Sequence, residues 1–209
     1  MRLILVRHGE TPWNEARRVQ GGRSDIGLGE RGLAQVERLA VALAGENIQA
    51  VYSSPLKRAL ATARAIARPH GLEVRPLSSL REIDAGQAEG LPVDRLKEDF
   101  APFWKEWREG DGPITWPGGE SVEQVARRAW GAIARLRRRH PGETVVVVGH
   151  AFVITSILVR ALGLPPGHFR RLRVEAGSVS VLELYQKGPL NNRLLLLNHT
   201  CPIREDGHK

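Results

Sequence analysis

The stretch Glu143-Thr144-Val145-Val146-Val147-Val148-Gly149-His150 places four consecutive valines directly before a glycine–histidine pair. A continuous apolar run of this kind is typical of a parallel strand that is covered on both faces. The next residues, Phe152 to Leu162, are mostly apolar and predict a helix. This part of the chain therefore predicts a strand, a turn and a helix, which is the repeating unit of an α/β protein.

Four further runs flank this unit and predict the rest of the sheet. They are Arg2 to Val6, Ala50 to Ser53, Val179 to Leu184 and Arg193 to Leu197. Because strand and helix patterns alternate along most of the chain, right-handed crossovers are expected. The predicted fold class is α/β: a doubly wound, mostly parallel sheet with helices on both faces and a small helical insertion or lid.

Apolar residues at helical spacing predict two helices in the first third of the chain. One has its apolar stripe between Leu33 and Leu43, and the other between Leu56 and Ile66. The second is preceded by Ser54-Pro55, which resembles a helix cap followed by proline at the first helical position. This start would place Arg58 in the first helical turn.

A third helix is predicted after Ser121, which forms a capping-box pattern with Gln124. It should end near Arg139, in the basic cluster Arg135 to Arg139.

The chain carries 31 basic and 23 acidic residues, a formal charge of +8, which can recruit anions of several kinds. We interpret the cluster as a solvated helix end, where cations are favourable, and we expect no nucleic-acid partner.

The length of 209 residues and the 42% hydrophobic content predict a single domain over 1–209. The segment 92–117 fits the alternation least and is expected to be a helical insertion, with Trp104 and Trp107 packing it onto the domain rather than stacking on a ligand.

The single cysteine, Cys201, suits a reducing compartment. The start of the chain resembles no secretory signal and 145–162 is broken by polar residues, so a cytoplasmic protein without a membrane span is expected.

Four polar side chains fall where predicted parallel strands end or shortly after. Arg7 and His8 follow the first strand, Arg58 follows the second, and His150 follows the valine strand. Ligands of open α/β sheets bind at this edge. Two guanidinium groups match phosphate oxygens in geometry and charge, and the same positive charge lowers the pKa of a nearby imidazole and leaves a neutral, nucleophilic nitrogen. Any one of these residues alone would usually be structural, but four at one edge favour a phosphoryl-transfer site.

Together with several other motifs, these residues resemble the histidine phosphatase superfamily, in its phosphoglycerate-mutase-like branch. The motifs are Leu5 to Thr11 with Asn14; Gln20-Gly21 with Asp25, Leu28 and Gly32; Ser53 to Ala59; Leu80 to Ile83 with Gly86 and Glu89-Gly90; Pro117 to Ser121; and Val148 to His150.

The resemblance implies a metal-independent phosphomonoesterase that hydrolyses a small phosphorylated metabolite. His8 would form a phosphohistidine while Glu82 acts as acid and then as base. The implied catalytic set is His8, Glu82, Arg7, Arg58 and His150, and the implied substrate-binding set is Arg7, Asn14, Gln20, Gly21, Arg58 and His150. No cofactor is expected. A homodimer is compatible with the sequence.

Two other functions are compatible with these residues. A cofactor-dependent phosphoglycerate mutase would return the phosphoryl group to substrate, and an inactive relative would only bind a phosphate ester or a nucleic acid. Zinc bound by His8, Glu82 and His150 is disfavoured by the adjacent arginines. The glycines of 27–32 match a dinucleotide fingerprint, but no strand precedes them.

The identity of the phosphate ester stays open. The chain departs from the family pattern at Ala88, at Gly27 and in Gly149-His150-Ala151-Phe152, positions that would shape the pocket around the phosphate. The segment Arg173 to Glu175 resembles α-ribazole phosphatases. Phosphoglycerates, glycosyl phosphoglycerates, α-ribazole phosphate and other sugar phosphates are therefore candidates.

Overall fold

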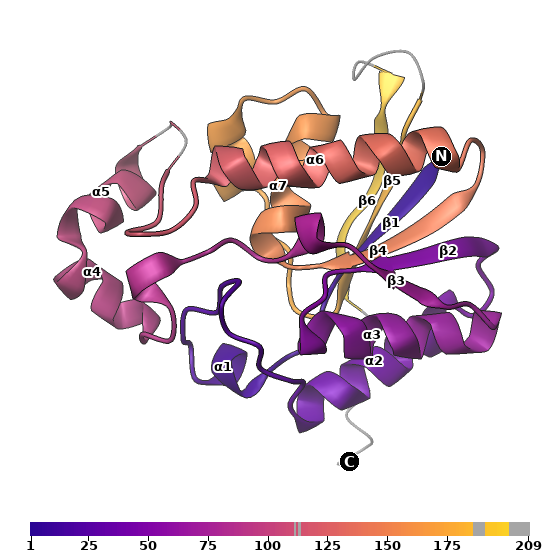
Figure 1. Cartoon of the computed structure of the whole chain (residues 1–209), viewed down its shortest axis with the longest axis horizontal. Helices are drawn as coiled ribbons and strands as arrows, with labels where there is room; N and C mark the ends of the chain where they lie inside the picture. The colour runs from indigo at the N-terminus through magenta and orange to yellow at the C-terminus, as the bar shows by residue number, and fades with distance from the viewer. Residues whose placement is uncertain (111, 113, 186–190, 201–209) are drawn as a thin grey trace, which may run out of the picture.

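One six-stranded sheet forms the centre of the protein (Figure 1), in the order β3-β2-β4-β1-β5-β6. The computed structural model describes residues 1–110, 112, 114–185 and 191–200. Its strands are β1 (Arg2–Arg7), β2 (Ile48–Ser53), β3 (Val74–Pro76), β4 (Thr144–Gly149), β5 (Ser178–Glu183) and β6 (Arg193–Thr200).

The four strands β1 to β4 run parallel, and β5 and β6 are added antiparallel at one edge. The valine strand β4 lies between β1 and β2, with Val6 opposite Val148 on one side and Tyr52 opposite Val147 on the other. This arrangement confirms the predicted α/β class with a mostly parallel sheet. Strand β3 was not expected, because its three residues carry no apolar run.

Helices cover both faces of the sheet, as Figure 1 shows. The α-helices are α1 (Pro12–Glu15), α2 (Glu30–Leu43), α3 (Lys57–Ala67), α4 (Leu96–Asp99), α5 (Ala101–Glu109), α6 (Val122–Arg139) and α7 (Ala151–Ala161). Short 3-10 turns are η1 (Arg68–His70), η2 (Ser78–Leu80), η3 (Gly86–Ala88), η4 (Val93–Arg95) and η5 (Pro166–Arg171).

The alternation of side chains in the central strands explains why the valine run is continuous. Val145 and Val147 point into the core beneath α6 and α7, whereas Val146 and Val148 point into the core beneath α2 and α3. All four are fully buried. Since each face of the strand is covered by helices, every position must be apolar.

Two helix starts were predicted, and one of them is wrong. The capping box of α6 is present, since the Ser121 hydroxyl accepts from the Gln124 N–H and the Gln124 side chain accepts from the Ser121 N–H. Helix α3, however, begins at Lys57 rather than at Pro55. Its cap comes from a distant loop, because Asp25 Oδ1 accepts from the Lys57 N–H at 2.7 Å, while the Ser54 hydroxyl lies 2.7 Å from His150 Nε2. Arg58 still falls in the first turn.

The segment 92–117 contains α4 and α5, which lie beyond one end of the sheet in Figure 1. Aromatic rings attach it to the domain: Trp107 lies 5.7 Å from Phe152 and from Phe169 between ring centroids, and Trp116 lies 5.8 Å from Phe152. Trp104 and Trp107 are both half-buried against the main core. Trp107 therefore makes the expected packing contacts with the domain, whereas Trp104 makes no ring contact of this kind among the described residues.

No helix in the described part of the chain is both long and apolar enough to cross a bilayer. The segment 145–162 is divided between β4 and α7, with His150 as the residue that starts the helix. Cys201 lies outside the described residues.

Candidate active site

The four side chains that the sequence places at strand ends converge at one edge of the sheet, and Glu82 joins them. His8 follows β1, and His150 follows β4 as the N-cap of α7. Their ring centroids are 5.1 Å apart. Arg58 comes from the first turn of α3, and Glu82 from the loop after η2. His8, Arg58, Glu82 and His150 are all at most 5% exposed, so the site is largely shielded from solvent.

One ring nitrogen of His8 is already engaged by the backbone. His8 Nδ1 lies 2.8 Å from the carbonyl oxygen of Gly9. A carbonyl only accepts, so Nδ1 must carry the proton and donate it. The Nε2 atom is left with a free lone pair, which makes it the nucleophilic atom of the ring.

The surroundings keep this ring neutral. The pKa of His8 is lowered well below its ordinary value of 6.5, first by burial and then by the positive charges of Arg7 and Arg58. Both causes disfavour the imidazolium form. At neutral pH the lone pair on Nε2 is therefore available.

The two arginines are fixed by backbone carbonyls. Arg7 Nη1 donates to Val174 O at 2.8 Å, while Arg58 donates from Nη1 to Ser24 O at 2.8 Å and from Nη2 to Gly21 O at 3.0 Å. In both residues Nε is buried and has no hydrogen-bond partner. Burial lowers the pKa of Arg58 to about 10, which still leaves it charged at neutral pH. Each guanidinium thus keeps N–H donors for an anion.

His150 is held by a hydroxyl that the sequence assigned to helix capping. Its Nε2 lies 2.7 Å from Ser54 Oγ, and that oxygen also accepts from the Leu56 N–H at 3.4 Å. The Ser54 proton is therefore free to be donated to Nε2, which leaves the ring proton on Nδ1. His150 Nδ1 is buried without a partner, so the arrangement leaves one N–H donor uncommitted in the site.

Glu82 is a buried carboxyl group held by two backbone amides. Its Oε1 accepts from the Ile83 N–H at 2.9 Å and its Oε2 from the Phe152 N–H at 3.3 Å. Burial raises the pKa of Glu82 above its ordinary value of 4.5 and outweighs the opposing effects of the two N–H donors and of Arg58. A carboxyl group with a raised pKa is suited to donate a proton.

Of the three remaining residues implied as substrate-binding, Asn14 lies in α1, and Gln20 and Gly21 lie in the segment that follows it. Asn14 Oδ1 accepts from the Thr11 N–H at 3.1 Å, and Gln20 Oε1 accepts from the Thr11 hydroxyl at 3.0 Å. Gly21 offers its carbonyl to Arg58. A Cβ atom at Gly21 would lie 2.5 Å from Glu89 Oε2 and 2.7 Å from Ile83 O, so a side chain there would push this loop away.

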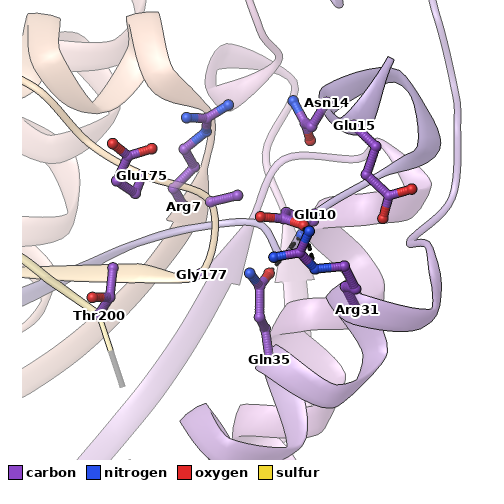
Figure 2. A pocket seen from close by; sticks show the side chains of 10 residues that line it. Arg7, Glu10, Asn14, Glu15, Arg31, Gln35, Glu175, Gly177 and Thr200 are labelled. Atoms are coloured by element: carbon purple, nitrogen blue, oxygen red, sulfur yellow. Dashed lines mark hydrogen bonds and ion pairs between the residues drawn. The ribbon is translucent and has the colours of Figure 1, made fainter. Parts of the chain in front are cut away.

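Two cavities meet at this site and share Arg7 and Asn14. The first, of about 640 Å³, is polar and includes Glu10, Glu15 and Glu175. Figure 2 shows it, with Glu10 between Arg31 and Gln35. The second has a volume of about 270 Å³ and contains both His8 and Glu82. We call this second cavity the aromatic chamber; its other walls are Arg18, Val19, Gln20, Gly21, Ile83, Ala85, Val93, Leu96, Trp104, Trp107, Trp116, Ala151 and Phe152.

The sequence interpretation missed Thr62 and Arg128, which form hydrogen bonds with the backbone of residues at the site. Thr62 accepts from the Gly9 N–H at 3.2 Å, and Arg128 donates to the carbonyl oxygen of Glu82 at 3.1 Å. Thr62 sits one helical turn after Arg58, a spacing that could have indicated it. The contact of Arg128 with residues 79–82 has no local signal, because it joins parts of the chain about 47 residues apart.

On this α/β scaffold the site combines a neutral imidazole with a free lone pair, two guanidinium groups and a carboxyl group with a raised pKa, a set that is chemically suited to phosphoryl transfer. Within the described residues, His, Cys, Asp and Glu side chains do not gather in threes as a metal site would require.

Comparison with known proteins places the chain in a family. Residues 3–198 match the model of the histidine phosphatase superfamily (branch 1), and the chain belongs to this family. It is 36% identical over 212 residues to phosphoserine phosphatase 1 of Hydrogenobacter thermophilus, covering 100% of this chain and 99% of that protein. The resemblance seen in the sequence is confirmed.

Solved structures of the family superpose closely. A mycobacterial glucosyl-3-phosphoglycerate phosphatase, solved with VO3, matches with a TM-score of 0.85 at 31% identity, over 95% of this chain and 99% of that one. The α-ribazole phosphatase of Shigella flexneri matches with a TM-score of 0.83 at 28% identity, over 95% and 96% of the two chains.

Proposed function

We propose that this protein is a phosphomonoesterase that hydrolyses a small phosphorylated metabolite through a phosphohistidine at His8, without a metal ion. The observation that carries the proposal is the state of His8: Nδ1 is committed to Gly9 O, the pKa is lowered, and Nε2 faces a chamber that also contains Glu82. A hydrogen bond to the backbone and burial would also suit a structural histidine, but their combination with Arg7, Arg58 and Glu82 in one site favours a nucleophile.

In the first step, His8 Nε2 attacks phosphorus and the bond between phosphorus and the ester oxygen breaks. Glu82 gives its proton to the departing alkoxide. The N–H donors of Arg7, Arg58 and His150 bind the equatorial phosphoryl oxygens, where charge is concentrated in the transition state. Asn14 and Gln20 line the entrance to the same space.

In the second step, the carboxylate of Glu82 takes a proton from water as the water oxygen attacks phosphorus. The bond between phosphorus and Nε2 breaks, its electron pair returns to the ring, and inorganic phosphate leaves. Glu82 ends the cycle protonated, as it began. The guanidinium groups supply the positive charge that Mg²⁺ supplies in many phosphoryl-transfer enzymes.

Three relatives have names that support hydrolysis, whereas relatives at 35% identity are named probable phosphoglycerate mutase GpmB. Phosphoserine phosphatase, glucosyl-3-phosphoglycerate phosphatase and α-ribazole phosphatase act, by their names, on phosphate esters of very different alcohols. What the names share is the release of phosphate. The conserved chemistry therefore belongs to the phosphate end of the site, and the alcohol end differs from one protein to the next.

The direct test is phosphate release from p-nitrophenyl phosphate in the presence of a metal chelator. We expect turnover by the unaltered protein, near-complete loss in His8→Ala, and unchanged turnover in His70→Ala, which alters a histidine of η1 at the far end of α3. Mass spectrometry of acid-sensitive adducts in rapidly quenched reactions should find the phosphoryl group on His8.

Two outcomes would overturn the proposal. Isomerised sugar phosphate in place of free phosphate would identify a mutase, and absence of turnover together with salt-sensitive RNA binding would identify a binding protein. A cytoplasmic location and a homodimer complete the proposal, and cell fractionation and sedimentation would test them.

A further inference from the structure

We infer that the alcohol part of the substrate is a flat, uncharged aromatic group, bound in the aromatic chamber. This inference rests on the proposed function, because it names the class of ester on which that function acts.

The position of Glu82 decides which cavity receives the alcohol. In an in-line displacement the departing oxygen lies opposite the attacking nitrogen and must be reached by the acid. The aromatic chamber contains both His8 and Glu82, whereas neither residue lines the polar cavity of Figure 2. That polar cavity also carries the carboxylates of Glu10, Glu15 and Glu175, which would repel an anionic ester.

The walls of the chamber favour an aromatic group. Three tryptophans and one phenylalanine line it: Trp104, Trp107, Trp116 and Phe152. Trp107, Trp116 and Phe152 are locked against one another, with centroid distances of 5.7 to 5.9 Å. Trp104 also lines the chamber and makes no such ring pair among the described residues, so we assign it the ring contact with the substrate. Aromatic rings stack favourably in offset or edge-to-face geometry.

A second charge on the alcohol would be poorly accommodated. Apart from Arg7, which we place at the phosphate, the lining cation is Arg18. Its side chain is exposed and already donates to Gly90 O at 2.8 Å. A carboxylate in the chamber would lose water against indole rings. The buried N–H groups of Gln20 Nε2 and Trp116 Nε1 have no partner and could donate to it, but Arg18 is solvent-screened and would compensate the negative charge poorly.

A sugar would also leave polar groups unpaired. Each buried hydroxyl needs an acceptor for its proton, and an unmet hydrogen bond costs about 1–3 kcal/mol. Asn14 Oδ1 and Gln20 Oε1 are occupied by Thr11, and Glu82 is needed for proton transfer. Apart from His8, which is the nucleophile, the other side chains of the chamber offer no acceptor: the unpaired polar groups Gln20 Nε2 and Trp116 Nε1 are donors and cannot receive a hydroxyl proton. The volume of about 270 Å³ lies just below the range of about 300–1,000 Å³ that holds drug-sized ligands, so a small ring system fits.

The test compares three esters whose leaving groups are all primary alcohols: ethyl phosphate, 2-phenylethyl phosphate and 3-phosphoglycerate. Their similar leaving-group chemistry removes the intrinsic advantage that phenyl esters have. We expect kcat/KM for 2-phenylethyl phosphate to exceed that for 3-phosphoglycerate by about 10- to 100-fold. An equal or higher value for 3-phosphoglycerate would overturn the inference.

Variants of Trp104 assign the preference to the chamber. Trp104→Leu should lower the ratio of 2-phenylethyl to ethyl phosphate by about tenfold, whereas Trp104→Arg should also raise kcat/KM for 3-phosphoglycerate. The matched control is Trp130→Leu, which alters a half-buried tryptophan of α6 in a different groove and should leave all three values unchanged. Equal effects of Trp104→Leu and Trp130→Leu would contradict the assignment.

The experiments distinguish an error in the inference about the aromatic alcohol from an error in the proposed phosphatase function. If the protein releases phosphate from all three esters at similar rates, the inference about the aromatic alcohol is wrong and the phosphatase function stands. If it releases phosphate from none of these esters nor from p-nitrophenyl phosphate, the proposed function itself is wrong. The comparison of esters needs only the unaltered protein, so it holds even if a variant does not fold.

Discussion

Arg128 of α6 and Glu120 form a two-pronged ion pair behind the active site. Arg128 Nε donates to Glu120 Oε1 and Nη2 to Glu120 Oε2, each at 2.9 Å. Both side chains are less than a third exposed, and such bidentate pairs are geometrically specific. This pair links α6 to the loop that carries Glu82.

The link is made through the backbone of that loop. Arg128 also donates to Ser79 O at 2.9 Å and to Glu82 O at 3.1 Å, and Glu120 Oε2 accepts from the Asp84 N–H at 3.0 Å. The chain is therefore tied on both sides of Glu82. Arg128 touches no reacting group, so we regard it as a positioning residue.

Replacement of Arg128 by lysine should misplace the acid without removing it. A single ammonium cannot reproduce the planar fork, so we expect kcat for an alkyl phosphate to fall about 10- to 100-fold and kcat for an aryl phosphate to fall much less. The control is Arg127→Lys, on the exposed face of the same helix. A uniform loss on both esters would show a structural role only.

Glu82→Gln should separate the two classes of ester more strongly. The amide cannot protonate an alkoxide, and general acid catalysis contributes about 10²- to 10⁴-fold. We expect a loss in this range with alkyl phosphates and a smaller one with p-nitrophenyl phosphate, whose leaving group needs little protonation. Burst kinetics would show whether the second step is also slowed. Equal losses on the two substrates would rule out the acid role.

The pH dependence of alkyl ester hydrolysis should be bell-shaped. Burial raises the pKa of Glu82 above 4.5, so its acid form persists to higher pH than in an ordinary glutamate, and activity should fall as the pH rises through that raised pKa. Burial and the arginines lower the pKa of His8 well below 6.5, so activity should fall on the acid side only when His8 becomes protonated.

The acid and alkaline limbs of this pH profile can be assigned by measuring kcat/KM against pH with an aryl phosphate as substrate, and again with the Glu82→Gln variant. The alkaline limb should weaken with an aryl phosphate and in Glu82→Gln, whereas the acid limb should remain in both cases. An alkaline limb of unchanged size in Glu82→Gln would mean that another group titrates there.

Gly32 should be required for stability. It lies in the first turn of α2 where the loop after His8 crosses the helix, and a Cβ atom there would lie 2.0 Å from Glu10 O. Because the added Cβ atom would clash with the backbone, which cannot move aside as a side chain can, Gly32→Ala should lower the free energy of unfolding by about 1–3 kcal/mol or more, as is typical of overpacking. Gly45→Ala, where a Cβ meets nothing within 4 Å, should change it by less than about 0.5 kcal/mol. Urea unfolding would measure both, and equal effects would contradict the clash.

Local patterns were sufficient for most of the fold because both faces of the central strands are covered. Residues 3–6 of β1 and 145–148 of β4 are apolar at every position, and the stripes of α2 and α6 are regular, apart from Leu33, which is 54% exposed. The start of α3 was placed wrongly because its cap is supplied by Asp25, far away in the chain. Strand β3 was missed because three residues with a proline show no periodicity.

The sequence by itself determined the layers of this protein and the convergence of Arg7, His8, Arg58 and His150, since parallel strands bring their carboxyl ends to one edge. Tertiary structure alone decided the contact of His150 with Ser54, the support of Glu82 by Arg128, and the enclosure of the aromatic chamber by Trp104 and Phe152. These features depend on contacts between residues distant in the chain, and no spacing of neighbouring residues encodes such distances.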